Sequence, residues 1–354
     1  MNQSSGSGLP IRVLVVDDSA FVRKVLREVL GASADIEVVG AARDGLEALE
    51  QIAALRPDVI TLDLIMPNLD GFGVLANLPT EHRPRVVVVS THEAQSILGL
   101  AALEAGAIDV VHKPTALATT DLYDLATELL AKVRAAGRGR PPAPLGPPAA
   151  RQQGARAVRG ARAPQLYGTR LVAIGTSTGG PQALARLLPA LPQDLPVPLV
   201  IALHIPIGYT ADLARRLNER STLEVVEGSD RLLLRPGLVV LARAGQHLRI
   251  EHTSDGLHAR LDAVSFAPFR PSVDILFHSA VEAVGAKVVG VLLTGMGDDG
   301  CAGARAIHEA GGKVLTESES SCVVYGMPRS AIEAGVSTVS CTLERMAEEI
   351  QRWL

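Results

Sequence analysis

Five short apolar runs alternate with longer amphipathic stretches in the first third of the chain. Between the first two runs, apolar residues recur at helical spacing and stop at Gly31, which predicts a helix that packs on a sheet. Strands separated by helices of this length form a doubly wound parallel sheet. We therefore expect residues 11–133 to form a five-stranded parallel α/β domain. Its expected strands are residues 11–16, 37–41, 59–62, 85–89 and 109–111, and the helical stripe is Phe21, Val22, Val25, Leu26, Val29 and Leu30.

The alternation of strand-like and helical patterns returns after residue 168. Three shorter apolar runs, at 238–241, 248–251 and 257–261, follow one another at hairpin spacing and predict an antiparallel insertion. We expect residues 168–354 to form a second α/β domain with a largely parallel sheet and this hairpin insertion. Its other expected strands are 171–174, 199–203 and 288–293, and its expected helices begin at Pro181 and Thr210 or span 273–284, 303–310 and 343–354.

The segment between the two predicted domains, residues 134–167, is rich in Pro, Gly, Ala and Arg and has no hydrophobic period. Such a composition buries too little apolar surface to offset the entropy of ordering, so it predicts a flexible linker. Its arginines either keep an apolar linker in solution or form an electrostatic arm for nucleic acid. The polar residues 1–10 predict a disordered N-terminus.

Composition narrows the class of protein. No apolar run exceeds strand length and the first ten residues lack the pattern of a secretory signal, so we expect a cytoplasmic protein without membrane insertion. Aromatic residues make up 3% of the chain, which argues against a stacking platform for nucleic acid. Cys301, Cys322 and Cys341 have neither C-x-x-C nor metal-site spacing and predict reduced thiols.

Acidic residues follow two strands of the first domain. Asp17 and Asp18 come directly after the first strand, and Asp63 follows the third. The carboxyl ends of parallel strands meet at one edge of a sheet, so we expect the three carboxylates to lie together. A hard divalent cation relieves their mutual repulsion, and oxygen ligands of this kind suit Mg²⁺. The sequence therefore predicts a magnesium site formed by Asp17, Asp18 and Asp63.

Two more polar residues end strands at the same edge, Ser90 after the fourth strand and Lys113 after the fifth. With a cation bound, Asp63 is suited to accept a phosphoryl group, while the Lys113 ammonium and the Ser90 hydroxyl contact its oxygens. The domain resembles a response-regulator receiver domain, which implies phosphorylation of Asp63, Mg²⁺ as cofactor and a histidine kinase as phosphoryl donor. The resemblance is carried by VVDDS at 15–19, LDLIMP at 62–67, DG at 70–71, Ser90 and Lys113-Pro114.

A glycine-rich turn, GTSTGG at residues 175–180, joins the first strand of the second domain to a predicted helix. A strand that ends in G-x-S-x-G and opens into a helix holds a serine hydroxyl clear of the sheet, which is a place for a nucleophile. The alternatives are an ordinary tight turn and a phosphate-binding loop, although the turn lacks the lysine and the spacing of phosphate-binding motifs. The sequence favours Ser177 as a nucleophile.

A serine nucleophile needs a general base, which we expect at a neighbouring strand end. His204 directly follows the next strand, whereas other histidines of this domain fall in the hairpin insertion or on helices. A carboxylate must orient the base, and Asp298 and Asp299 both follow the strand at 288–293, so spacing leaves the two open. Backbone amides near Thr178 and in the turn 294–297 are candidates for an oxyanion hole.

The second domain resembles the chemotaxis protein-glutamate methylesterase/glutamine deamidase family. The resemblance implies that Ser177 is the nucleophile, His204 the base and acid, Asp299 the third member and the Met296 amide an oxyanion donor, in addition to the Thr178 amide that the glycine-rich turn suggests. It further implies hydrolysis of glutamate methyl esters and deamidation of glutamines on chemoreceptors, with no cofactor in the catalytic domain. Phosphorylation of the receiver is expected to open access to the active site. The matching stretches are IGTSTGGP at 174–181, HIPIGYT at 204–210, RPSVD at 270–274, LTGMGDDG at 293–300 and VYGMP at 324–328.

Three positions depart from the family pattern. Leu203 stands where the family usually has Gln, Arg243 where Pro is common, and Glu317 where Gln or Asp is more usual. The alternative function is a response regulator with a DNA-binding or non-catalytic output domain, which predicts a basic helix-turn-helix near the C-terminus. The second domain shows no such module, so we expect no nucleic-acid partner.

Overall fold

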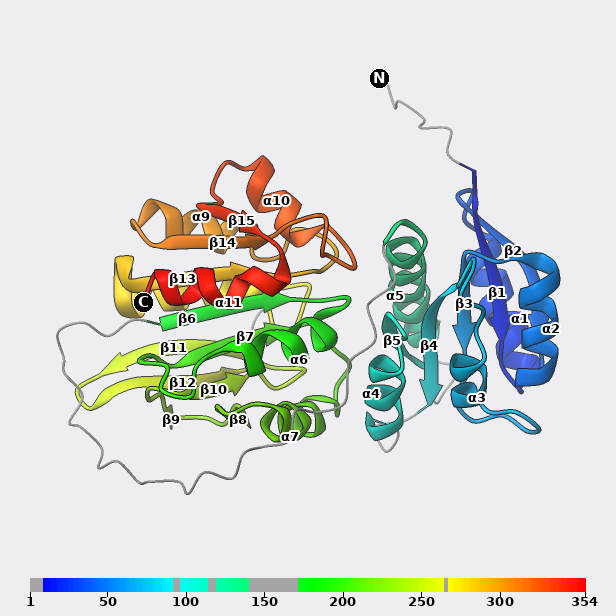
Figure 1. Ribbon diagram of the computed structural model, residues 1–354, viewed down its shortest axis with the longest axis horizontal. Helices are drawn as coiled ribbons and strands as arrows, with labels where there is room; N and C mark the ends of the chain where they lie inside the picture. Colours follow the sequence, from blue (N-terminus) through cyan, green and yellow to red (C-terminus); the bar gives the residue numbers. More distant parts are fainter. Residues whose placement is uncertain (1–8, 92–95, 114–118, 140–170, 264–266) are drawn as a thin grey trace. The chain divides into compact units, whose positions relative to one another are not determined.

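The computed structural model describes residues 9–91, 96–113, 119–139, 171–263 and 267–354 (Figure 1). The chain divides into two compact units, Met1–Pro144 and Leu145–Leu354, each built on its own sheet. The expected linker lies outside the described residues from position 140 onward, and so do the first eight residues of the expected disordered N-terminus.

The first unit is the predicted five-stranded parallel sheet, in the order β2-β1-β3-β4-β5 (Figure 1). Consecutive residues of the central strand β3 are all buried, as expected for a parallel strand covered by helices on both faces. The strands are β1 (Ile11–Val16), β2 (Ile36–Ala42), β3 (Val59–Leu62), β4 (Arg85–Thr91) and β5 (Asp109–Lys113), and the helices are α1 (Ala20–Gly31), α2 (Gly45–Leu55), α3 (Gly71–Ala76), α4 (Ser96–Glu104) and α5 (Thr119–Arg138).

Two details of this unit differ from the sequence-based expectation. Phe21 is 51% exposed, and within the predicted stripe of α1 only Leu26 and Leu30 are buried, because periodicity identifies a helix face but not how much sheet lies beneath it. Helix α5 continues to Arg138, past the expected start of the linker at residue 134. Arg134 pairs with Asp35 at 2.9 Å, and its hydrogen bond lowers the pKa of Asp35 to about 2.

The second unit is built on a seven-stranded parallel sheet in the order β15-β14-β13-β6-β7-β10-β8, with a separate three-stranded antiparallel sheet in the order β11-β12-β9 (Figure 1). The parallel strands are β6 (Leu171–Thr176), β7 (Leu199–Leu203), β8 (Glu224–Glu227), β10 (Leu238–Leu241), β13 (Val288–Leu292), β14 (Lys313–Glu317) and β15 (Val339–Cys341). The antiparallel strands are β9 (Leu232–Leu233), β11 (His247–Thr253) and β12 (Gly256–Asp262).

The helices of this unit are α6 (Gly180–Ala190), α7 (Thr210–Arg220), α8 (Val273–Val284), α9 (Cys301–Glu309), α10 (Met327–Glu333) and α11 (Leu343–Arg352), with a 3₁₀ turn, η2 (Gly285–Lys287). Helix α8 packs against the hairpin strand β11, against β6 and against α9. Its Phe277 is fully buried in the core that these elements share.

The assignment of residues 238–241 to the hairpin insertion was wrong. This run forms β10, which pairs in parallel with β7 and β8, and its four residues are all buried. The antiparallel sheet instead takes β9, a two-residue strand that the sequence did not suggest. The prediction grouped the three runs because they are close together in sequence. The uninterrupted apolar run at 238–241 is instead typical of a parallel strand that is buried on both faces.

Candidate active site

Carboxylates of the first unit cluster at the carboxyl edge of its sheet, as predicted. Strands β1 and β3 are neighbours, and the Asp63 amide donates to the Val16 carbonyl at 2.9 Å. Oxygen atoms of Asp17, Asp18 and Asp63 all lie within 4.8 Å of one another. Three carboxylates in this arrangement fit a hard divalent cation such as Mg²⁺.

Lys113 reaches the same cluster from β5. Its Nζ lies 2.5 Å from Asp17 Oδ2 and 2.8 Å from Asp63 Oδ2, and all three side chains are largely buried. Burial raises the pKa of Asp17, against the lowering effect of the Lys113 ammonium. A single ammonium thus faces two buried carboxylates and a third nearby, a charge balance that a bound cation would improve. Ser90, also buried, lies near the carboxyl end of β4, where its neighbour Thr91 pairs with Lys113.

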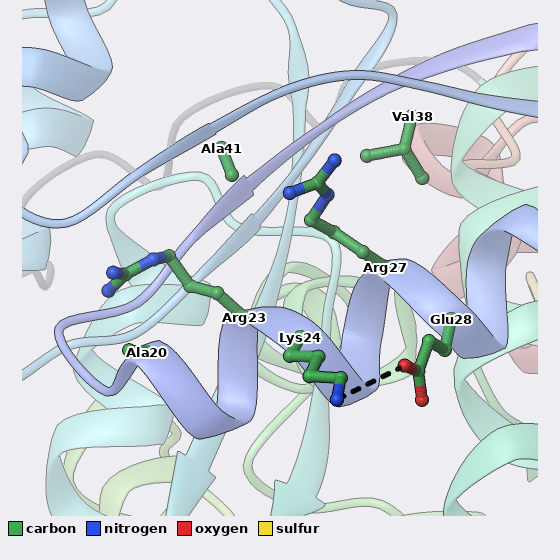
Figure 2. Close-up of a pocket in the computed structure, with 7 residues that line it drawn as sticks. All are labelled: Ala20, Arg23, Lys24, Arg27, Glu28, Val38 and Ala41. Atoms are coloured by element: carbon green, nitrogen blue, oxygen red, sulfur yellow. Dashed lines mark ion pairs between the residues drawn. The ribbon is translucent and has the colours of Figure 1, made fainter.

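A basic pocket lies between α1 and β2 and was not predicted (Figure 2). Its cations are Arg23, Lys24 and Arg27, and Lys24 pairs with Glu28 at 3.9 Å. Arg23 also donates to the backbone carbonyls of Asp17 and Asp18, at 2.8 and 2.9 Å. Arg23 therefore braces the backbone that carries two of the three carboxylates.

In the second unit, Ser177 occupies the turn between β6 and α6. Gly179 has φ +81°, and a Cβ there would lie 2.7 Å from Val323 Cβ, so the turn requires glycine at this position. Pro181 lies in the first turn of α6, where its missing N–H costs no hydrogen bond. Ser177 is 8% exposed, and its amide donates to the Thr294 carbonyl at 3.1 Å.

His204 lies at the end of the neighbouring strand, as predicted. Thr176 and Leu203 are register partners, and the His204 amide donates to the Thr176 carbonyl, so Ser177 and His204 directly follow paired positions. His204 Nε2 lies 2.8 Å from Asp299 Oδ2. The imidazole stacks on Phe269, with ring centroids 4.4 Å apart. The sequence analysis did not identify Phe269.

Asp299, rather than Asp298, meets His204. Besides the His204 ring, its carboxylate accepts the Ser272 hydroxyl at 2.9 Å and the amides of Val273 and Asp274 at 2.8 and 3.0 Å. Burial opposes ionisation of Asp299, but the hydrogen bonds from His204 and these amides outweigh it and lower the pKa of Asp299. Asp298 is exposed. The donors belong to the first turn of α8 and its N-cap, the RPSVD stretch to which the sequence analysis gave no role.

The turn that follows β13 lies against Ser177. Gly295 has no room for a side chain, because a Cβ there would lie 3.0 Å from Ser177 Cβ and 2.3 Å from Met327 Sδ. The Gly295 carbonyl accepts the amides of Gly326 and Met327, which fixes the turn from its other side. The structure therefore brings the segment that contains Met296 beside the turn that contains Ser177 and Thr178.

Both domains of the chain match known protein families. A family model for the CheB methylesterase matches residues 172–350, and one for the response regulator receiver domain matches residues 13–123. A relative from Myxococcus xanthus, protein-glutamate methylesterase/protein-glutamine glutaminase 5, is 58% identical over 97% of this chain and 98% of its own length. The chain belongs to the CheB methylesterase family.

Other CheB-type relatives align over nearly the whole chain. The protein-glutamate methylesterase/protein-glutamine glutaminase of Bacillus subtilis is 41% identical over 92% of this chain and 93% of its own length. The crystal structure of the Thermotoga maritima CheB methylesterase catalytic domain is 36% identical, with a TM-score of 0.52, and covers 52% of this chain and 99% of that one. The second domain is thus a methylesterase domain, not a DNA-binding output domain. Within the part of the chain that the structure describes, no helix is long and apolar enough to cross a membrane.

Proposed function

We propose that this protein is a protein-glutamate methylesterase and protein-glutamine glutaminase that acts on chemoreceptors and is activated through its receiver domain. The observation that carries the proposal is the contact of 2.8 Å between His204 Nε2 and Asp299 Oδ2. His204 follows β7, which pairs with β6, the strand that Ser177 follows. The names of the full-length relatives support this activity and both of its substrates.

In the proposed mechanism, Ser177 attacks the carbonyl carbon of a glutamate methyl ester. Because Asp299 holds Nε2 of His204, Nδ1 is the ring nitrogen left to take the hydroxyl proton. Asp299 stabilises the imidazolium that forms. The proposed oxyanion donors are the amide of Thr178, in the same turn as Ser177, and the amide of Met296, in the turn that follows β13.

Collapse of the tetrahedral intermediate breaks the bond to the methoxy group. His204 returns the proton to this leaving group, which departs as methanol and leaves an acyl-enzyme on Ser177. A water molecule, deprotonated by His204, then attacks the acyl carbon. The bond to Ser177 Oγ breaks, Oγ takes the proton back from His204, and the receptor side chain is left as a glutamate carboxylate. With a glutamine side chain the same steps release ammonia. No cofactor is assigned to this domain.

In the receiver domain, Asp63 is the proposed phosphoryl acceptor and a histidine kinase the donor. Asp17, Asp18 and Asp63 would hold Mg²⁺, which neutralises charge on the transferring phosphoryl group. Lys113 and Ser90 would contact the phosphoryl oxygens. A cytoplasmic location belongs to the same proposal and is supported by the free thiols of Cys301, Cys322 and Cys341.

Methanol release from methylated receptor membranes tests the proposal and the non-catalytic alternative together. The wild-type protein is expected to release methanol, and Ser177→Ala is expected to reduce the rate by at least about a thousandfold. A wild-type protein without activity would support the non-catalytic output domain. A Ser177→Ala variant with wild-type activity would remove Ser177 from the mechanism.

A further inference from the structure

A buried carboxylate outside the proposed triad lies at the end of β14. Glu317 is 1% exposed, and burial raises its pKa. Its Oε2 accepts the backbone amide of Thr294 at 2.8 Å, and its Oε1 accepts the Ser321 hydroxyl at 2.9 Å. None of the ion pairs formed by the described residues includes Glu317. Burying a carboxyl group without a counter-ion carries a desolvation penalty. We therefore ask what its hydrogen bonds contribute to the site.

The residue it holds, Thr294, connects three segments of the site. The Thr294 carbonyl accepts the Ser177 amide at 3.1 Å and the Thr176 hydroxyl at 2.7 Å. The Thr294 hydroxyl donates to the Thr178 carbonyl at 2.9 Å and accepts the Val324 amide at 2.9 Å. Thr294 therefore fixes the backbone around Ser177 relative to the turn that contains Met296.

The Thr294 amide is buried and donates to the Glu317 side chain, past the last register pair of β13 and β14. Without an acceptor it would be an unsatisfied buried donor, which is costly, so we expect the Thr294 backbone to shift when the Glu317 side chain is removed. A shift of the Thr294 backbone would move both amides proposed for the oxyanion hole, because the hydrogen bonds of Thr294 link their loops.

We propose that Glu317 is a positioning residue for the reaction, which holds Thr294 and thereby sets the geometry between Ser177 and the oxyanion donors. The inference rests on the proposed hydrolase function. The Thr294 amide needs only an acceptor, and the Ser321 hydroxyl can either donate or accept. A glutamine side chain can bond to both, because its carbonyl oxygen accepts and its amide group donates. The role therefore requires the acceptor and not the charge.

The test compares Glu317→Ala and Glu317→Gln with the matched control Glu349→Ala in the full-length protein. Glu349 is also buried, at 3% exposure, but it lies on α11 and pairs with Arg345 and Arg352. Glu317→Ala is expected to lower kcat for methanol release by about 10- to 100-fold with little change in KM. Glu317→Gln is expected to restore kcat, and Glu349→Ala to leave it unchanged.

Amide hydrogen exchange provides a second measurement that does not depend on the substrate. Peptides that cover 175–180 and 293–300 are expected to exchange faster in Glu317→Ala than in the wild type, and at the wild-type rate in Glu317→Gln. Equal loss of kcat in both Glu317 variants, or in the Glu349 control, would overturn the proposal. If the wild-type protein released no methanol, the proposed function would fail, whereas faster exchange confined to Glu317→Ala would still support the hold on Thr294.

Discussion

At the scale of the residue, the two neighbouring aspartates after β13 have different environments. Asp299 is buried and accepts four hydrogen bonds, from His204, Ser272, and the Val273 and Asp274 amides, whereas Asp298 is exposed. A carboxylate held by several donors stays ionised and can stabilise a neighbouring imidazolium. Burial and hydrogen bonding thus distinguish Asp299, the residue proposed to orient His204, from its neighbour in sequence.

We expect Asp299→Asn to lower kcat for methanol release by about 10³- to 10⁴-fold, because a neutral amide neither fixes the ring tautomer nor stabilises the imidazolium. Asp298→Asn is the matched control and should retain nearly wild-type kcat. Steady-state assays of the two variants check this. Similar losses in both would contradict the assignment of Asp299.

Glu317 leads to a prediction about stability and pH. Because its folded-state pKa is raised above 4.5, the folded chain holds this proton more tightly than the unfolded chain. The contribution of Glu317 to wild-type stability therefore falls as the pH rises from about 4.5 through the folded-state pKa. Glu317→Gln removes this dependence. The Tm of the variant should therefore equal that of the wild type near pH 4 and exceed it increasingly toward neutral pH, by about 2–4 °C for each kcal/mol of difference in unfolding free energy. Thermal unfolding of both proteins across this range measures it, and a pH-independent Tm difference would count against the raised pKa.

At the scale of the element, the strand-to-helix turn after β6 depends on two glycines whose neighbours leave no space. A Cβ on Gly180 would lie 2.6 Å from Leu203 Cδ1, and one on Gly179 would meet Val323 in addition to straining a left-handed backbone. The close approach of β6, β7 and Val323 therefore favours glycine at both positions of the turn that follows Ser177.

Gly179→Ala is expected to destabilise the protein by about 2–4 kcal/mol, from backbone strain together with the clash on Val323. Gly285→Ala is the matched control, because Gly285 has φ +58° but no atom within 4 Å of an added Cβ. It should cost only the strain, about 1–2 kcal/mol. Urea unfolding of the two variants measures the difference, and equal losses would show that the turn tolerates a side chain.

At the scale of the whole molecule, the chain carries two sites of different chemistry on two separate units. The acidic cluster with Lys113 is suited to hold a cation and a phosphoryl group, and the Ser177 site to hydrolyse an ester. A regulatory coupling between them requires that phosphorylation change the population of an active state. That coupling is tested by altering the receiver domain and measuring the catalytic domain.

Asp63→Asn is expected to retain the basal rate of methanol release but to lose the increase produced by a small-molecule phosphodonor with Mg²⁺. Chelation of Mg²⁺ should abolish the same increase in the wild-type protein, because Asp17, Asp18 and Asp63 would lose the cation that neutralises the phosphoryl charge. Methanol release with and without phosphodonor measures both effects. Activation that survives in Asp63→Asn would place the phosphoryl group elsewhere.

Local pattern was sufficient for much of the architecture and for the position of several polar residues. The apolar runs that form β1, β3 and β7 are buried along their whole length or nearly so. A strand that is buried on both faces must be apolar whichever strands it pairs with, so its sequence alone reveals it. In a parallel sheet the carboxyl ends of strands share an edge, so Asp17, Asp63 and His204 were predictable as strand-end residues.

Other features were decided only by tertiary structure. The run 238–241 became a parallel strand because β7 and β8 flank it, and Asp299 became the partner of His204 because the first turn of α8 donates to it. Phe269 and Glu317 contact the site from segments more than 20 residues away in sequence from the groups they hold. Spacing along the chain determines which residues end a strand, but strand neighbours and long-range hydrogen bonds depend on where distant segments pack.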